Sequence, residues 1–271
     1  MARTSPVVNV MQSAARKVAR GLVRDFGEIE NLQVSRKGPG DFVTNADTRV
    51  DRKLRELLSQ ARPKFGFLTE EGGAQAGEDG GRRWIVDPID GTTNFMHGIP
   101  MFAVSIALEE AGNVTAGVVY APITDEMFWA ERGQGAYLND RRLRVAARRD
   151  LQEAVIATGI PHLRPEATPG YLPELRAIMD ECAGVRRLGS AALDLAYVAA
   201  GRFDGFWETG LSPWDVAAGL LLVRESGGMV SRTDGGTDPM EKGDVLAGND
   251  AIHTRMLRLI RQARRPGPAT G

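Results

Sequence analysis

The sequence predicts a fold that mixes α-helices and β-sheets along two successive halves. Residues 7–26 carry apolar side chains at three- and four-residue spacing, which predicts an amphipathic helix. Between residues 65 and 130, short apolar runs alternate with Gly, Asn and Pro, which is typical of a sheet. From residue 154 onwards, short strands alternate with helices that end at glycines. We therefore expect an N-terminal α+β subdomain over residues 1–145 and a C-terminal α/β subdomain over residues 146–271.

The elements of the first half can be placed in order. A second helix is expected after Thr44, and strands are expected over residues 65–68, 84–86, 102–108, 114–120 and 127–130. The run Gly133-Gln-Gly135 lacks the third glycine and the following helix of a dinucleotide-binding fingerprint, so it predicts a hairpin turn.

The second half contains two helices with clear ends. Helices are expected over residues 190–200, closed by Gly201, and 213–226, closed by Gly227. An alternating run over residues 202–208 predicts a strand that ends at Glu208. Near the C-terminus, five arginines recur at helical spacing and predict a solvated helix face, namely Arg255, Arg258, Arg261, Arg264 and Arg265.

Composition excludes several classes of protein. The 271 residues carry 34 basic and 35 acidic side chains, and this balance argues against nucleic-acid affinity across the whole surface, although a local basic patch stays open. The single cysteine, Cys182, excludes an internal disulfide and a cysteine-rich zinc site, and we expect it to be packed. No apolar run approaches the ~18 residues of a membrane helix, and no signal peptide is recognised, so we expect a cytoplasmic protein without membrane contact.

The ionisable side chains point to carboxylate chemistry. The three histidines, His97, His162 and His253, have no spacing that suggests a zinc site or the base of a nucleophile. In the segment 84–95, an apolar strand leads directly into Asp87 and Asp90. Two carboxylates this close raise each other's pKa unless a cation lies between them, and Mg²⁺ prefers oxygen ligands.

The backbone of the same segment can bind an anion. Gly91 permits a sharp turn into a helix start, whose free amides near Thr92 would face a phosphate. The alternative is that Asp87 and Asp90 are turn and cap residues, because Asp-Pro and Asp-Gly are common loop signals.

The whole string Trp84-Ile-Val-Asp87-Pro-Ile-Asp90-Gly-Thr-Thr-Asn-Phe95 resembles the metal-binding signature of the inositol monophosphatase family. Three further segments are similar to other elements of that family: Asp41-Phe-Val-Thr44-Asn-Ala-Asp47, Thr69-Glu70-Glu71-Gly72, and Ser212-Pro-Trp214-Asp215-Val-Ala-Ala-Gly219 with its continuation to Gly228. The resemblance extends from the first helix to about Ile260 and is greatest to the bacterial SuhB type, through residues 187–201. It implies a layered α-β-α-β-α sandwich.

The resemblance also implies a metal site and a catalytic set. Glu70, Asp87 and the carbonyl of Ile89 would hold one Mg²⁺, and Asp87, Asp90 and Asp215 a second, while a third near Glu70 stays open. Thr92, oriented by Asp47, would position the attacking water together with Glu70. The N-terminal subdomain would thus carry the main metal-binding loops, and the C-terminal subdomain would complete the site.

The implied reaction is hydrolysis of a phosphate monoester, with inositol 1-phosphate as the leading substrate and sensitivity to Li⁺. Sugar, histidinol and nucleotide phosphates are alternatives, since fold alone does not choose among them. The implied substrate contacts are Asp90, Gly91, Thr92, Gly189, Ser190, Ala191, Glu208 and Asp215. A homodimer is also implied by the resemblance.

Local patterns allow other interpretations of these acids. Asp215 fits a capping box that begins at Ser212, and Thr44 with Asp47 fits the same pattern. Glu70 and Glu71 could be solvated loop acids, and Glu208 an exposed strand-end acid. A second functional hypothesis is a binding role toward RNA polymerase or antitermination factors, for which the sequence offers the C-terminal arginines and a basic run over residues 141–149.

Overall fold

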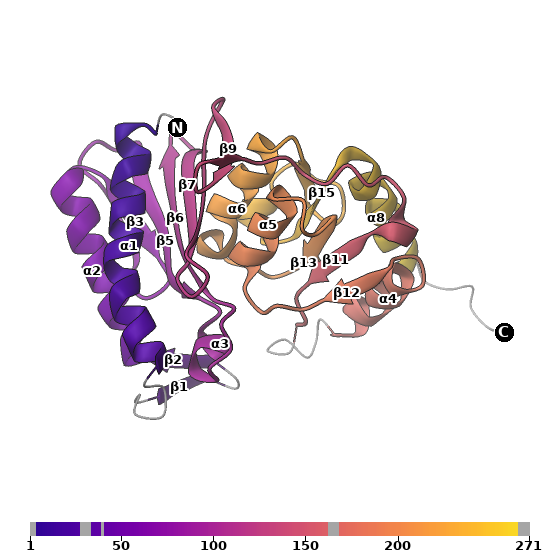
Figure 1. Ribbon diagram of the computed structural model, residues 1–271, viewed down its shortest axis with the longest axis horizontal. Coiled ribbons are helices and arrows are strands. Elements are labelled where there is room, and N and C mark those ends of the chain that lie inside the picture. Colours follow the sequence, from indigo (N-terminus) through magenta and orange to yellow (C-terminus); the bar gives the residue numbers. More distant parts are fainter. Residues whose placement is uncertain (1–3, 28–33, 39–40, 162–167, 265–271) are drawn as a thin grey trace.

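The structure, a computed structural model, describes residues 4–27, 34–38, 41–161 and 168–264. Five layers lie side by side along the long axis of the molecule (Figure 1). A helix pair covers an eight-stranded sheet, a second pair lies between this sheet and a five-stranded sheet, and a third pair covers the far side. The α-β-α-β-α sandwich expected from the resemblance is therefore confirmed.

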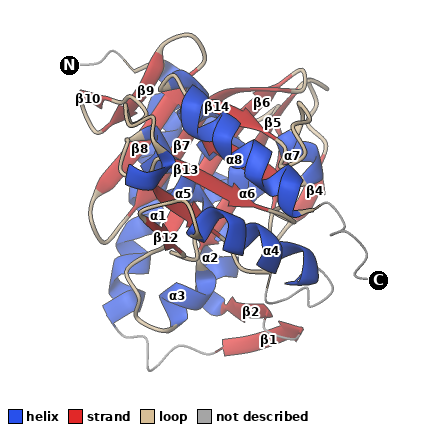
Figure 2. Cartoon of the chain, turned by 90° about the vertical axis from the view of Figure 1, so that its right-hand side faces the viewer, coloured by secondary structure: helices blue, strands red, loops and turns tan. Residues whose placement is uncertain are grey.

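The helix pairs of the three α layers come from separate parts of the chain. In order, they are α1 (Pro6–Gly27) with α2 (Asn45–Ala61), α5 (Ala191–Ala199) with α6 (Pro213–Glu225), and α4 (Thr168–Met179) with α8 (Asp250–Ala263). Viewed from its far end, the molecule presents α4 and α8 in front of the second sheet (Figure 2). Two short helices, α3 (Thr92–Met96) and α7 (Pro239–Lys242), lie in connections.

The eight-stranded sheet is built almost entirely from antiparallel neighbours. Its spatial order is β10-β9-β8-β7-β6-β5-β3-β4, and only β3 and β5 pair in parallel. The strands are β3 (Gly66–Thr69), β4 (Gly73–Gln75), β5 (Arg82–Asp90), β6 (Ala103–Glu110), β7 (Asn113–Ala121), β8 (Glu126–Glu131), β9 (Gly135–Leu138) and β10 (Arg141–Arg142). A separate hairpin joins β1 (Val34–Gly38) to β2 (Asp41–Thr44).

The five-stranded sheet has the order β12-β11-β13-β15-β14. Strand β11 runs parallel to both β12 and β13, while β15 is antiparallel to its two neighbours. The strands are β11 (Val155–Thr158), β12 (Gly184–Arg186), β13 (Gly205–Glu208), β14 (Met229–Ser231) and β15 (Val245–Gly248).

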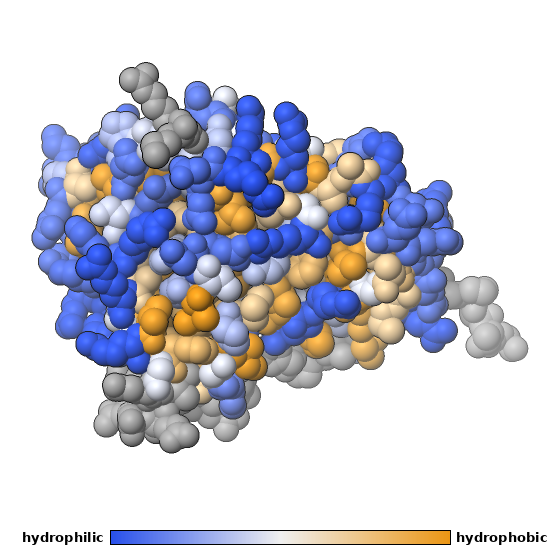
Figure 3. Space-filling model, viewed as in Figure 1, coloured by the Kyte–Doolittle hydropathy of each residue, from blue (hydrophilic) through white to orange (hydrophobic). Residues whose placement is uncertain are grey.

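Three apolar cores fill the spaces between the layers. The first joins α1 and α2 to one face of the large sheet, with Leu22, Leu54 and Trp84 fully buried. The second lies around α5 and α6, and the third lies beneath α4 and α8. The outer surface over α1 and α2 is mostly hydrophilic (Figure 3), as expected for amphipathic helices whose apolar faces point inward.

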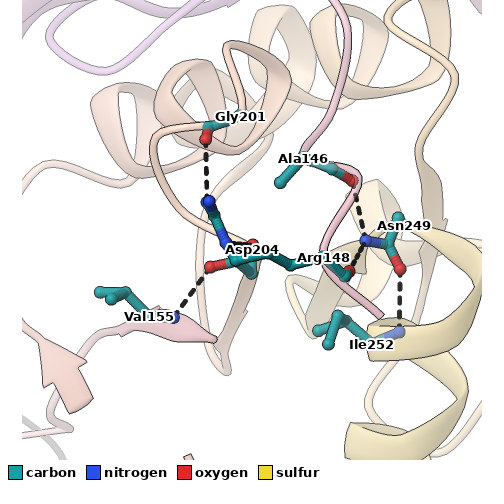
Figure 4. A network of polar contacts seen from close by, with 7 residues as sticks. All are labelled: Ala146, Arg148, Val155, Gly201, Asp204, Asn249 and Ile252. Carbon is teal, nitrogen blue, oxygen red and sulfur yellow. Dashed lines mark hydrogen bonds and ion pairs between the residues drawn. The ribbon is translucent and has the colours of Figure 1, made fainter. Parts of the chain in front are cut away.

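A polar network anchors the segment that connects the two sheets (Figure 4). Buried Asp204, just before β13, accepts hydrogen bonds from Arg148 Nε at 2.7 Å and from the Val155 amide at 2.8 Å. Asn249, at the start of α8, donates its side-chain amide to the carbonyl oxygens of Ala146 and Arg148 at 2.9 and 2.6 Å. The network therefore fixes where β13 begins relative to β11 and α8.

The elements whose bounds could be predicted from the sequence lie within a few residues of those bounds, with two differences. The strand expected over residues 84–86 continues to Asp90, and the strand expected over residues 202–208 begins only at Gly205. Two of the arginines expected on a solvated helix face form ion pairs instead: Arg255 pairs with Glu181, and Arg264 pairs with Glu174. Arg265 and His162 lie outside the described residues.

In the described part of the chain, none of the helices is long and apolar enough to cross a bilayer.

Candidate active site

The parallel pairing of β3 with β5 brings the first two predicted acids together. Thr69, the last residue of β3, lies opposite Val86, and the amide of Glu70 donates to the Val86 carbonyl oxygen at 3.3 Å. Glu70 therefore follows its strand at the same level as Asp87 follows Val86. This placement at the end of the sheet confirms the expected proximity, although Glu70 itself is exposed.

A bulge at the end of β5 presents two carboxylates from one strand. The register with β6 shifts between Asp87, opposite Ser105, and Asp90, opposite Ala103. Pro88 lies within the irregularity and has no N–H to donate to the ladder, and the Ile89 amide instead donates to Asp87 Oδ1 at 3.0 Å. Asp87 and Asp90 are 2% and 9% exposed, so both charges are held in a largely dry environment.

Gly91 turns the chain from β5 into α3. Its φ of 96° is left-handed, and a Cβ there would lie 2.9 Å from the Met101 carbonyl oxygen and 3.3 Å from that of Gly189. Glycine is thus required both by the backbone conformation and by the close approach of the segment around Gly189, here called the 189 segment. The predicted helix start is confirmed, although α3 contains only five residues.

Asp90 is held by the start of α5. Its Oδ2 accepts hydrogen bonds from the Ser190 hydroxyl and, at 2.7 Å, from the Ala192 amide. Burial raises the pKa of Asp90 to about 6, while the hydrogen bonds from Ser190 and the amides of α5 oppose that rise. The segment Gly189 to Ala191 therefore lies directly against a predicted metal ligand.

Asp215 enters the site from the start of α6. Its Oδ2 accepts a hydrogen bond from the Ser212 amide at 2.7 Å, so the carboxylate serves as part of the predicted capping box. A carboxylate has about four acceptor positions, so the cap leaves oxygen lone pairs for another partner. Ser105, opposite Asp87 on β6, donates to the Trp214 carbonyl oxygen at 3.4 Å and joins α6 to the end of the sheet that carries Asp87.

The acids interact strongly with one another. Burial, followed by the charges of Glu70, Asp90, Asp215 and Asp47, raises the pKa of Asp87 well above its ordinary range. The pKa of Asp215 is raised in the same direction, first by burial and then by Asp90. A set of carboxylates that destabilise each other's charged forms matches the donor chemistry of a hard divalent cation.

Three of the acids already have a hydrogen-bond donor for one oxygen. Asp87, Asp90 and Asp215 each accept from a backbone amide, and within the described ranges no three acidic, histidine or cysteine side chains yet converge on one metal-sized point. The residues that can supply oxygen to a metal are those predicted: Glu70, Asp87, the carbonyl of Ile89, Asp90 and Asp215.

Thr92 and Asp47 lie close to this set. The Thr92 hydroxyl donates to the Ile89 carbonyl oxygen at 2.9 Å, so its lone pairs can accept a hydrogen bond from another group. Asp47 is 2% exposed at the start of α2, and its charge contributes to the raised pKa of Asp87. The pairing of Asp47 with Thr92 stays a prediction.

Glu208 reaches the site from the end of β13. Burial raises the pKa of Glu208 to about 8, the Asp90 charge adds to this rise, and the Arg187 guanidinium opposes it. Glu208 is half-buried, so the alternative of an exposed strand-end acid is wrong.

Two buried polar residues near the site were not singled out from the sequence. Asn94 donates its side-chain amide to the carbonyl oxygens of Met101 and Leu188, both at 2.7 Å, and joins the β5–α3 turn to the 189 segment. Asp194 is 1% exposed on α5, and its pKa is raised well above the ordinary value by burial and then by Glu208 and Asp90. Asn94 could have been found because it belongs to the signature string. The sequence signal for Asp194 is weaker, because it consists only of an acid among the apolar residues of a helix.

Comparison with known proteins identifies the family. A family model described as the inositol monophosphatase family matches residues 3–265. The chain belongs to the inositol monophosphatase family. An inositol-1-monophosphatase of Mesorhizobium japonicum is 60% identical over 262 residues, which are 97% of this chain and 98% of that protein.

Other members of this inositol monophosphatase family support the same assignment. The Nus factor SuhB of Escherichia coli K12 is 44% identical over 256 residues, 94% of this chain and 96% of that one. A crystal structure of the extragenic suppressor protein suhB from Bartonella henselae superposes with a TM-score of 0.93 at 58% identity, covering 95% of this chain and 99% of that chain. Members of the family are generally metal-dependent.

Proposed function

We propose that this protein hydrolyses a phosphate monoester in a Mg²⁺-dependent reaction, with myo-inositol 1-phosphate as its substrate. The observation that carries the proposal is the group of carboxylates at the end of β5 and the start of α6. Burial first, and then the charges of neighbouring acids, raises the pKa values of Asp87 and Asp215. The names of the relatives from Mesorhizobium japonicum and Rhizobium meliloti, at 60% and 57% identity, support the choice of inositol 1-phosphate. Sugar, histidinol and nucleotide phosphates are the competing substrates.

The proposed ligands divide between two Mg²⁺ positions. Glu70, Asp87 and the carbonyl of Ile89 form one set, and Asp87, Asp90 and Asp215 form the other, with a third position near Glu70 as a variant. When bound, the metal neutralises the acids, lowers the pKa of a coordinated water and polarises the phosphate ester. Without such charge compensation, the acids would repel a phosphate dianion.

The residues around the metal positions have distinct roles. Glu70 and the Thr92 hydroxyl orient the attacking water and accept its hydrogen bonds, and Asp47 supports Thr92. The amides that follow Gly91 face the phosphate oxygens at the start of α3, and Glu208 accepts hydrogen bonds from substrate hydroxyl groups. A water that attacks in line with the leaving oxygen needs no covalent phosphoenzyme.

Phosphate release from a panel of monoesters tests this function. The panel contains inositol 1-phosphate, fructose 1,6-bisphosphate, histidinol phosphate and adenosine monophosphate, each with Mg²⁺, with EDTA and with added millimolar Li⁺. We expect Mg²⁺-dependent, Li⁺-sensitive release that is fastest from inositol 1-phosphate. Preference for another ester would replace the substrate and keep the reaction, whereas no release from any ester would overturn the proposal.

A second candidate function is favoured by one comparison. The Escherichia coli relative at 44% identity is named Nus factor SuhB, so we propose, as the alternative, a binding role toward RNA polymerase or antitermination factors. The basic residues first considered for it are partly engaged within the chain, since Arg148 pairs with Asp204 and Arg255 with Glu181. Affinity capture of the purified polymerase and its elongation factors on the immobilised protein tests this role, and no retention would count against it.

Self-association as a homodimer is proposed with the primary function and is checked by light scattering.

A further inference from the structure

Gly159 lies beside Glu208 in the five-stranded sheet. Strands β11 and β13 are parallel, and Thr158 is paired with Trp207, so Gly159 and Glu208 occupy the next level of the same register. Side chains at one level of two parallel strands project to the same face. The neighbour of the Glu208 side chain on that face is therefore a residue without a side chain.

The Glu208 carboxyl group occupies the space that a side chain at position 159 would need. A Cβ built on Gly159 would lie 1.9 Å from both Cδ and Oε1 of Glu208 and 2.3 Å from Oε2. The φ angle of Gly159 is not positive, so alanine can adopt the same backbone conformation. The feature that calls for a glycine here is the space that the Glu208 carboxyl group occupies.

The atoms that would be displaced are the end of a flexible side chain. An added methyl group would push the carboxyl group back by roughly 1.5 Å to reach ordinary van der Waals contact, and the two strands need not move. The carboxyl group at its present position interacts electrostatically with Asp90, Asp215 and Arg187. Burial first, and then the charge of Glu208 among other groups, also raises the pKa values of Asp194 and Tyr171. The Glu208 carboxyl group therefore lies within electrostatic range of Asp90 and Asp215, which are proposed metal ligands.

We propose that Gly159 is a specificity-determining residue, because it leaves open the space from which the Glu208 carboxyl group reaches a hydroxyl group of the substrate. The inference rests on the proposed function and deepens it. It assigns the selection of a polyol ester among phosphate monoesters to the steric relationship between Gly159 and Glu208.

Gly159→Ala tests the inference through a ratio of two substrates. Inositol 1-phosphate carries ring hydroxyl groups, whereas 4-nitrophenyl phosphate has none. We expect the ratio of kcat/KM for the first ester to that for the second to fall by about 10- to 100-fold, mainly through a higher KM for inositol 1-phosphate. The matched control is Gly170→Ala on α4, because Gly170 is exposed and a Cβ there has no atom within 4 Å. An unchanged ratio in a folded Gly159→Ala protein would overturn the inference.

A double-mutant cycle separates an effect through Glu208 from general damage. In the Glu208→Ala background, the carboxyl group is gone, so Gly159→Ala should cause no further loss of kcat/KM for inositol 1-phosphate. Two losses that simply multiply would show that Gly159 acts by another route and would overturn the inference. Circular dichroism and thermal unfolding of all four proteins establish that each is folded.

A crystal structure of the Gly159→Ala protein distinguishes failure of this inference from failure of the proposed function. The expected result is a Glu208 carboxyl group displaced by more than an ångström with both strands in place. If the carboxyl group does not move, the steric argument is wrong whatever the activity. If it moves but the unsubstituted protein hydrolyses no polyol phosphate, the proposed function has failed and the specificity role fails with it.

Discussion

The Asp90 carboxylate accepts a hydrogen bond of 2.7 Å from the Ala192 amide, 102 residues later in the chain. This contact joins the end of β5 in the large sheet to the start of α5, which lies between the two sheets. The site is therefore assembled at a junction of layers, and its acids come from the residue after β3 and from β5, α2, α6 and β13. Their mutual proximity is a property of the whole sandwich.

Asp90→Asn should lower turnover by at least two orders of magnitude with little loss of stability. The amide side chain keeps an oxygen for the Ala192 amide but has no charge with which to hold a metal. Phosphate release at saturating Mg²⁺, compared with thermal unfolding of the same sample, checks both parts. Near-normal turnover would sink the assignment of Asp90 as a ligand.

Asp87→Asn should stabilise the metal-free protein. Burial and four nearby carboxylates disfavour the charge of Asp87, so removing it should raise Tm in EDTA by roughly 2–4 °C, which corresponds to about 1 kcal/mol. Added Mg²⁺ should raise the Tm of the unsubstituted protein and leave that of the variant nearly unchanged. Scanning calorimetry with EDTA and with Mg²⁺ measures both shifts. A Tm that falls in EDTA would contradict the repulsion argument.

Glu208 should make stability depend on pH. Its pKa rises from an ordinary 4.5 to about 8 on folding, so the folded state binds the proton more tightly than the unfolded state. The corresponding stability is fully present below pH 4.5 and is lost as pH rises through about 8. Glu208→Gln has no such titration, so its Tm advantage over the unsubstituted protein in EDTA should grow between pH 5 and pH 9. A constant difference across that range would show that Glu208 is not desolvated.

Asp204→Ala should destabilise the fold by about 2–4 kcal/mol. It leaves the Val155 amide and the Arg148 guanidinium without their buried acceptor at the start of β13 (Figure 4). Arg149→Ala is the matched control, because the neighbouring arginine pairs with Asp250 at the surface and its loss should leave Tm nearly unchanged. Urea unfolding gives the free energy of unfolding of both variants. Equal losses would contradict the argument that the buried Asp204 contributes more to stability than the exposed ion pair of Arg149.

Most of the long helices and the central strands of the large sheet could be predicted because their signals are local. The apolar spacing over residues 7–26 indicates the extent of α1, and the capping box at Ser212 marks the start of α6. Both signals lie within the helices themselves. The strand expected over residues 202–208 was too long because the amides of Arg202 and Phe203 donate to the Tyr197 carbonyl oxygen. The Asp204 side chain is held by Arg148 and by the Val155 amide. Such long-range partners leave no pattern in the residues that they engage.

The sequence by itself determined the chemistry: which acids are present, that Asp87 and Asp90 follow an apolar strand, and that a glycine turns the chain after them. These features depend on residues adjacent in the chain, where sterics and hydrogen bonding act directly. Only the tertiary structure decided that Asp90 is held by α5 and that Gly159 leaves room for Glu208. Both relationships depend on how the layers pack. Packing brings together residues that are far apart in the sequence, and the sequence does not specify their distance in space.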